Sequence, residues 1–195
     1  MGTPWTEWYD WPTLEVLDGI LGKVLVHEQR GRRVSGVIVE AEAYIGESDP
    51  ACHAAAGLTP RTAPLYGPPG LAYVYLNYGL HHLVNVVTEP EGAPAAVLIR
   101  ALVPLEGIAA MRRRRGGAVD ERLTNGPGNL TQALGIDLRH NRVNLAEGTV
   151  RLEDHGIRPT AIRATPRIGI RVGREKLWRR TGELTVPFAG RALPA

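Results

Sequence analysis

Apolar positions recur along the chain with two periods, one typical of helices and one typical of strands. Leu14, Leu17 and Leu21 are spaced i, i+3 and i+7, which predicts a short helix over residues 12–22. Elsewhere, short apolar or alternating runs bounded by turn residues predict strands. The predicted strands cover residues 23–29, 33–44, 71–76, 82–89, 95–103, 149–154 and 161–172, and further helices are predicted over 104–115, opened by Pro104, and at the end of 123–136.

These elements predict an α+β fold whose sheet is mainly antiparallel or mixed, with the helices outside it. The length of 195 residues fits a single domain, residues 1–195. Residues 45–70 are irregular, and loops of this length are often functional. The chain after the last predicted strand is expected to form a tail.

The predicted strand 33–44 carries two carboxylates on one face. Because side chains alternate along a strand, four of them point one way and their neighbours point the other. The first set is Ile38, Glu40, Glu42 and Tyr44, and the second, suited to the core, is Val37, Val39, Ala41 and Ala43. A like-charged neighbour tends to raise the pKa of a partly buried carboxyl, as a general base requires. The same pattern also fits a solvated strand face with arginine partners opposite.

Tyr78 lies at the predicted turn between two strands. Gly79 allows the chain to turn there, while Tyr73 and Tyr75 share one face of the preceding strand. A large side chain at an exposed tip gains nothing from burial in its own fold, but it gains if a base stack receives it. Alternatively, the tip folds back and Tyr78 caps the core.

Composition and charge exclude several classes of protein. The chain is 44% hydrophobic and 22% charged, and no apolar run approaches the ~20 residues of a membrane span. The N-terminus lacks a basic segment followed by an apolar one, so we expect a protein that is not secreted and is cytoplasmic, or nucleoid-associated if bacterial. The net charge of +3 is compatible with a polyanionic partner without requiring one.

Composition also narrows the cofactor chemistry. Cys52 is the only cysteine, which excludes an internal disulfide and a cysteine-based zinc site. The six histidines show no metal-ligand spacing, so no metal is expected. Lys23 and Lys176 are the only lysines and leave few candidates for Schiff-base chemistry. His53, in the long loop, becomes a candidate for chemistry only if that loop returns beside Glu42.

Several motifs occur together in a fixed order. They are "ILGKVLVHE", "VEAEAYIGESDPACHA", "TPRTAPLYGPPG", "AYVYLNYGLHHLVNVV", "AAVLIRALVPLEG", "LTNGPGNLTQALGI" and "PRIGI". In this order they resemble the alkyladenine (3-methyladenine, or methylpurine) DNA glycosylase family, over about residues 21–170. Ordered motifs are far more specific than any one of them alone.

The resemblance implies a single compact domain with a curved, mostly antiparallel mixed sheet, flanking helices and a protruding β-hairpin. It implies a monomer that binds double-stranded DNA through the minor groove, with neither a metal nor an organic cofactor. In this family, a tyrosine at the hairpin tip fills the gap left by a flipped nucleotide, and Tyr78 occupies that position in "YVYLNYG". Stacking by the tip would offset part of the few kcal/mol that unstacking costs.

The remaining site residues carry over from the same motifs. Glu42 matches the carboxylate that activates the water attacking C1′, and Arg100 matches an arginine near that water. The base pocket would be formed by Tyr44, by Tyr75 facing it, by His53 at its edge and by Asn85, which helps exclude unwanted guanines. Leu65 matches an apolar wedge opposite Tyr78. Thr62 stands where relatives often carry asparagine, and the C-terminal part lacks the family's usual Pro-Trp-Arg-Phe ending.

The function implied is a monofunctional DNA glycosylase of base excision repair that leaves an abasic site. The expected substrates are alkylated or deaminated purines: 3-methyladenine, 7-methylguanine, hypoxanthine and ethenoadenine. Two alternatives stay open at this point. One is a protein that binds damaged DNA without catalysis, although carboxylates facing a polyanion would weaken such binding. The other is a nucleosidase, which would have no use for a tyrosine that fills a gap in duplex DNA.

Overall fold

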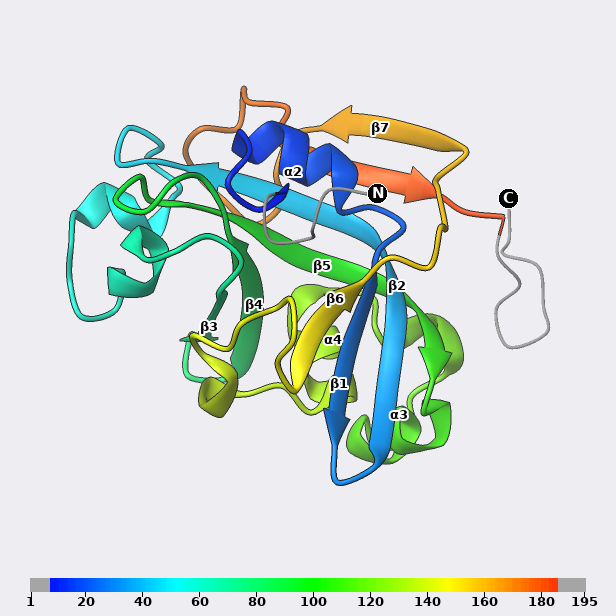
Figure 1. The fold of residues 1–195 in the computed structure, drawn as a ribbon. Coiled ribbons are helices and arrows are strands. Elements are labelled where there is room, and N and C mark those ends of the chain that lie inside the picture. Colours follow the sequence, from blue (N-terminus) through cyan, green and yellow to red (C-terminus); the bar gives the residue numbers. More distant parts are fainter. Residues whose placement is uncertain (1–7, 186–195) are drawn as a thin grey trace, which may run out of the picture.

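The computed structural model describes residues 8–185, which form one eight-stranded sheet with helices around it (Figure 1). The strand order is β3-β4-β5-β2-β1-β6, while β8 pairs with β2 and with β7. The strands are β1 (Val24–Gln29), β2 (Arg32–Ile45), β3 (Ala72–Asn77), β4 (His81–Val87), β5 (Ala95–Glu106), β6 (Val150–Glu153), β7 (Ala161–Thr165) and β8 (Arg179–Glu183). Every pairing in this described part is antiparallel, which confirms the α+β class.

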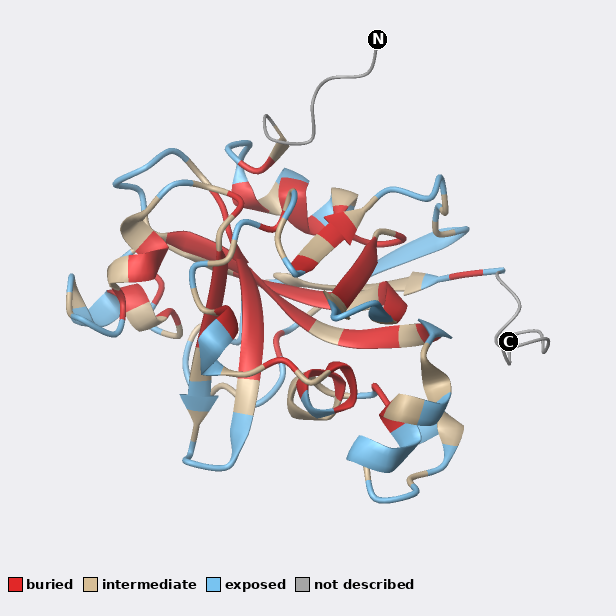
Figure 2. Cartoon of the chain, turned by 60° about the horizontal axis from the view of Figure 1, so that its bottom comes forward, coloured by how far each residue is buried: buried red, intermediate tan, exposed pale blue. Residues whose placement is uncertain are grey.

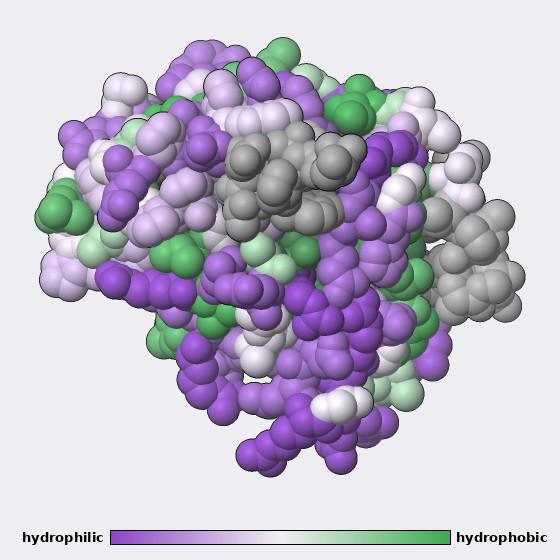
Figure 3. All heavy atoms as spheres, viewed as in Figure 1, coloured by the Kyte–Doolittle hydropathy of each residue, from purple (hydrophilic) through white to green (hydrophobic). Residues whose placement is uncertain are grey.

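Short helices and 3₁₀ turns among the described residues pack around the sheet. The helices are α2 (Thr13–Gly19), α3 (Ile108–Arg114) and α4 (Pro127–Leu134), and the 3₁₀ turns are η1 (His53–Ala56), η2 (Ala63–Tyr66), η3 (Asp120–Arg122) and η4 (Leu138–His140). Helix α2 lies against β2 and β5, and α4 lies against β4 and β5. The central strands are buried, whereas the far end of the β3–β4 hairpin is exposed (Figure 2). Hydrophilic residues predominate on the face of the molecule seen in Figure 3. None of the helices in residues 8–185 has the length and apolar character needed to cross a bilayer.

Helix α3 starts later than predicted. Pro104 lies within β5, where it is paired with Gly36, and the helix begins only after Gly107. The pairing shifts register between Ser35 and Gly36, and a strand tolerates proline at such a bulge because the ladder is already interrupted there. Gly107 has φ 70°, and a Cβ on it would come within 2.7 Å of the Arg33 carbonyl oxygen. A glycine is therefore required where the strand turns into the helix.

The C-terminal part also differs from the prediction. The strand predicted over 161–172 ends at Thr165, because Pro166 follows and cannot donate to a ladder. The segment expected to be a tail contains β8, which pairs with β2 at Glu40 and Glu42. The Trp178 carbonyl continues this contact by accepting from the backbone N–H of Ala43 at 2.8 Å. The predicted single domain also includes residues 1–7 and 186–195, which lie outside the described residues.

A β-bulge in β2 changes the predicted faces of this strand. The pairing with β5 shifts register between Ile38 and Ala41. As a result, Ile38 lies in the same core cluster as Ala41, whereas Val37 and Val39 pack in a separate cluster. The prediction that Ile38 shares a face with Glu42 is therefore wrong. One extra residue in a strand turns the side chains beyond it to the opposite face.

Candidate active site

A cavity of about 400 Å³ opens between the end of β2, the loop 45–70, the β3–β4 hairpin and the loop after β7. Its walls are largely aromatic, and its polar groups come from β4, β5 and the long loop. Seven of the eight predicted site residues line it: Arg100, Tyr44, His53, Tyr75, Asn85, Tyr78 and Leu65. The structure therefore gathers into one place side chains that the sequence distributes over more than fifty positions.

The eighth residue, Glu42, lies directly behind the cavity wall. Its side chain is fully buried, and three donors hold its carboxylate. Oε1 accepts from the backbone N–H of Ile168 at 2.7 Å, and Oε2 accepts from the Tyr44 hydroxyl at 2.8 Å and from Arg100 Nη1 at 3.3 Å. All three donors belong to residues that line the cavity. Because a carboxylate has about four acceptor positions, one remains for a further donor such as a water.

Glu40 and Arg179 extend this cluster away from the cavity. Oε1 of Glu40 accepts from Arg100 Nε and from Arg179 Nε, both at 2.7 Å. Burial raises the pKa of Glu40, but hydrogen bonds from Arg179 and Arg100 outweigh burial and hold that pKa below its ordinary value. The predicted pair of carboxylates, Glu40 and Glu42, is thus bridged by Arg100, whose positive charge compensates their repulsion.

A buried ion pair supports the outer side of Tyr44. Arg167 lies with its guanidinium carbon 4.8 Å from the Tyr44 ring centre, and it donates to Asp49 at 2.5 and 2.8 Å. Both charged side chains are fully buried. Burial, followed by the charge of Glu42, raises the pKa of Tyr44, so its hydroxyl remains a hydrogen-bond donor at physiological pH. Tyr44 therefore contacts two charged groups: its hydroxyl donates to the Glu42 carboxylate, and its ring packs against the Arg167 guanidinium.

A cluster of three rings forms another part of the cavity lining. His53 packs edge-on against Tyr75 with ring centres 4.6 Å apart, and Tyr73 lies 5.3 Å from Tyr75. His53 Nδ1 lies 2.9 Å from the Tyr73 hydroxyl. Burial, and then the charge of Arg61, lowers the pKa of His53, so its imidazole is neutral at pH 7. The long loop thus returns to the cavity and places His53 against Tyr73 and Tyr75.

Two predicted residues occupy the floor of the cavity. Asn85 is 4% exposed and donates from Nδ2 to the Tyr73 carbonyl on the paired strand at 3.0 Å. Leu65 is 2% exposed and packs against Cys52 and Tyr73. Leu65 is therefore buried among the rings of the cavity wall, and its role as a wedge stays a prediction.

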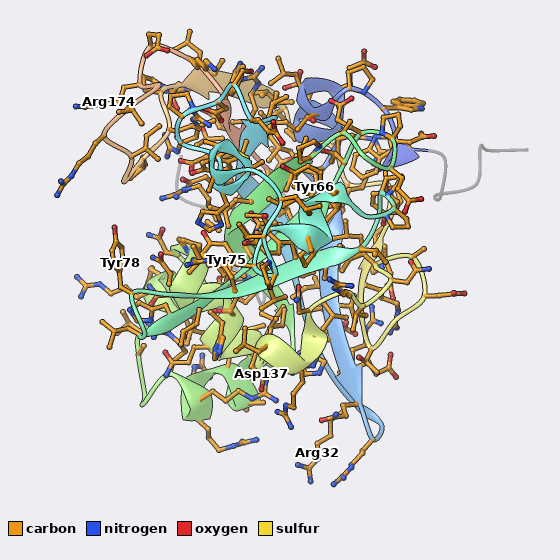
Figure 4. All side chains as sticks on the ribbon, turned by 90° about the vertical axis from the view of Figure 1, so that its left-hand side faces the viewer. Arg32, Tyr66, Tyr75, Tyr78, Asp137 and Arg174 are labelled. Atoms are coloured by element: carbon orange, nitrogen blue, oxygen red, sulfur yellow. The ribbon has the colours of Figure 1, made fainter. Side chains whose placement is uncertain are left out.

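Tyr78 is 89% exposed at the tip of the hairpin, and Figure 4 shows it pointing away from the rest of the molecule. It does not fold back onto the core. Tyr78 and Gly79 both have positive φ, 48° and 71°, and Leu80 N–H donates to the Asn77 carbonyl at 3.0 Å. A left-handed conformation is unfavourable for a bulky residue. Tyr78 therefore combines backbone strain with an exposed ring, and neither stabilises the free protein.

The described residues contain neither a cluster that could bind a metal nor a reactive thiol. Within residues 8–185, no group of three or more His, Cys, Asp or Glu side chains is arranged to hold a metal ion. Cys52 is buried, and burial raises the pKa of its thiol, so it is a poor nucleophile at neutral pH. The chemistry of the cavity rests on carboxylate, guanidinium, phenol and imidazole groups.

An aromatic cavity with a buried carboxylate at its wall and an exposed aromatic on a nearby hairpin is typical of enzymes that flip a base out of a duplex. Comparison with known proteins identifies the family. Residues 7–183 match the family model described as methylpurine-DNA glycosylase (MPG). This chain therefore belongs to the methylpurine-DNA glycosylase family. It is a DNA-repair enzyme, a glycosylase that hydrolyses N-glycosidic bonds in DNA, so the alternative of a binder without catalysis is not supported.

Curated relatives are similar over most of their length, and each bears the name "Putative 3-methyladenine DNA glycosylase". The protein of Prosthecochloris aestuarii is 46% identical over 182 residues, covering 92% of this chain and 88% of the relative. That of Chlorobium phaeobacteroides is 49% identical over 171 residues, covering 87% and 86%. That of Rubrobacter xylanophilus is 52% identical over 161 residues, covering 82% and 83%.

Ile168, Arg167 and Asp49 contribute to the site but were not predicted from the sequence. Ile168 contributes a backbone N–H rather than a side chain, and residue type says nothing about such a donor. Arg167 and Asp49 lie 118 positions apart and form their pair only in the folded chain. The available signal is their place in two of the quoted motifs: "PRIGI" contains Arg167 and Ile168, and "VEAEAYIGESDPACHA" contains Asp49.

Proposed function

We propose that this enzyme is a monofunctional glycosylase that flips damaged purines out of double-stranded DNA and hydrolyses their glycosidic bond with a water activated by Glu42. The observation that carries the proposal is the position of the Glu42 carboxylate, fully buried against an aromatic cavity beside Arg100. A buried carboxylate with one unfilled acceptor position suits the binding and deprotonation of a water. The product is an abasic site.

Tyr44 and Tyr75, which both line the cavity, would stack on the flipped base. An alkylated purine carries positive charge, so it gains cation–π attraction to these rings that a neutral base lacks. Such a base is also a good leaving group. The curated relatives are named for 3-methyladenine, and the same logic extends to 7-methylguanine, which is also cationic. Hypoxanthine and ethenoadenine are neutral, so we propose that they stack on the same rings and become good leaving groups once they are protonated. Asn85, buried in the cavity, would discriminate against normal guanines.

Tyr78 would enter the minor groove and fill the space left by the flipped nucleotide. Its exposure and its strained backbone support this role, because both are costs that a bound duplex would offset. His53 would contact the base and a flanking phosphate from the rim of the cavity. No residue is assigned to a Schiff base, so we expect base release without strand cleavage. We further propose that the enzyme acts as a monomer in the cytoplasm.

The proposal is tested by base release from duplex oligonucleotides that contain a single hypoxanthine or 7-methylguanine, with and without alkali. Wild type should give alkali-labile sites only, and strand cleavage without alkali would contradict the monofunctional mechanism. Glu42→Gln keeps the size of the side chain and should lower the single-turnover rate by at least about 100-fold. It should still bind the damaged duplex. Base release by Glu42→Gln at the wild-type rate would show that another group activates the water.

A further inference from the structure

Arg100 divides its hydrogen bonds unequally between two carboxylates. Its Nε donates to Glu40 at 2.7 Å, whereas its Nη1 lies at 3.3 Å from Glu42. Guanidinium and carboxylate groups prefer a bidentate pair with two short bonds. Arg100 forms no such pair with Glu42, although the two side chains are in contact. Glu40 therefore takes the stronger bond of this arginine.

Arg179 holds Glu40 in the position that makes this sharing possible. Its Nε donates to the same Oε1 atom that Arg100 contacts, and its Nη1 donates to Thr165 Oγ1 at 2.9 Å. The Glu40 side chain is 13% exposed, so water screens these contacts little. The result is a row of four alternating charges: Arg179, Glu40, Arg100 and Glu42.

A general base has to remain ionised and still be able to accept a proton. A bidentate pair with Arg100 would favour the ionised form so strongly that Glu42 would accept a proton poorly, and it would fill the position that a water needs. The single long contact at 3.3 Å leaves that position open while keeping the cation beside the carboxylate.

We propose that Glu40, held by Arg179, is a positioning residue that keeps Arg100 from pairing fully with Glu42 and thereby sets the strength of the base. This inference rests on the proposed role of Glu42. The charged and titratable groups near Glu42 come from every element packed against it: Tyr44 and Glu40 on β2, Arg100 on β5, Tyr75 on β3, Arg167 after β7 and Arg179 on β8. Of these, only Glu40 and Arg179 act on Glu42 through Arg100.

Two charge-removing variants should shift the pH–rate profile in opposite directions. Glu40→Gln removes a negative charge and releases Arg100 toward Glu42, so protonation of the base requires a lower pH. Arg179→Gln leaves Glu40 with Arg100 as its only cation, which draws Arg100 away from Glu42, so the base protonates at a higher pH. Each shift of the acidic limb should be about half a pH unit, and Glu40→Gln should also lower the plateau rate several-fold.

The experiment measures single-turnover base release from a saturating duplex that contains hypoxanthine, between pH 4.5 and 8, with thermal melting of each variant as a check of folding. Thr165→Val is the matched control, because it removes the second hydrogen bond of Arg179 without changing charge, and it should leave the acidic limb in place. Opposite shifts in the two charge variants would support the positioning role.

The inference is overturned if the acidic limbs of Glu40→Gln and Arg179→Gln both stay at the wild-type pH or both move in the same direction, even where the rates fall. If one variant does not fold, the other still tests the inference, because the direction in which its acidic limb should move is predicted independently. Failure of the proposed function gives a different result: wild type itself would release no base, or Glu42→Gln would retain the wild-type rate.

Discussion

The backbone N–H of Ile168 donates to Oε1 of Glu42 at 2.7 Å, and the two residues are 126 positions apart in the sequence. Arg167, the preceding residue, is anchored by Asp49 and by the Ala43 carbonyl. The loop after β7 is therefore fixed to the end of β2, and its backbone donor is aimed at the carboxylate. Hydrogen bonds to a charged group stabilise it by about 1.5–3 kcal/mol.

Deletion of this donor should impair catalysis. Ile168→Pro removes the N–H while the side chain, 49% exposed, contributes little packing. Because the carboxylate would lose one of its three donors, we expect single-turnover base release to fall by about 10- to 100-fold. Ile168→Ala keeps the N–H and should remain within a few-fold of wild type. Equal loss in both variants would show that the side chain, and not the backbone donor, matters.

Replacement of Tyr78 should separate stability from activity. In Tyr78→Asn the left-handed conformation becomes easier, and almost no buried surface is lost, so the free energy of unfolding should rise by ~1 kcal/mol. Base release from duplex DNA should nevertheless fall, because asparagine cannot replace the stacking of the flipped base. Chemical denaturation and single-turnover assays on the same preparations measure the two effects.

Tyr78→Phe is the matched control, since it keeps the ring. It should keep most of the activity on duplex substrate and the stability of wild type. Full activity of Tyr78→Asn on a duplex would contradict the proposed role of the hairpin tip.

Glu153 should make the free energy of unfolding depend on pH in the acidic range. The pKa of Glu153 is lowered from 4.5 to about 2, chiefly because Arg33 donates hydrogen bonds to its carboxylate. Burial opposes this shift, and hydrogen bonds from His155 and Arg151 add to it. The pKa is depressed in the folded state, so the stabilisation is fully present above pH 4.5 and is lost as the pH falls toward 2. In Glu153→Gln, the free energy of unfolding should therefore fall less steeply over this window.

The measurement is urea denaturation at several pH values between 5 and 2. Glu147→Gln is the control, because Glu147 has no ion-pair partner among the described residues, and its slope should match that of wild type. If the free energy of unfolding of Glu153→Gln falls with pH as steeply as that of wild type, carboxylates other than Glu153 cause the loss of stability in acid.

Local pattern determined much of this protein. Alternation along β3 predicted correctly that Tyr73 and Tyr75 share a face, and Gly79 marked the turn that exposes Tyr78. Alternation also placed Glu42 and Tyr44 on one side of β2, where the phenol now donates to the carboxylate. Such features depend on neighbours a few positions apart, so the period of the strand and the chemistry of the turn are enough to predict them.

Tertiary structure decided the rest. The bulge in β2 moved Ile38 to the core side, and a strand no pattern had predicted, β8, brought Arg179 to Glu40. Burial of Leu65 and the donor from Ile168 likewise follow from packing between segments far apart in the chain. Periodicity describes one element at a time, whereas register, bulges and backbone donors result from the best packing of all elements together. The sequence thus supplied the reactive groups, and only the folded chain determined which of them meet.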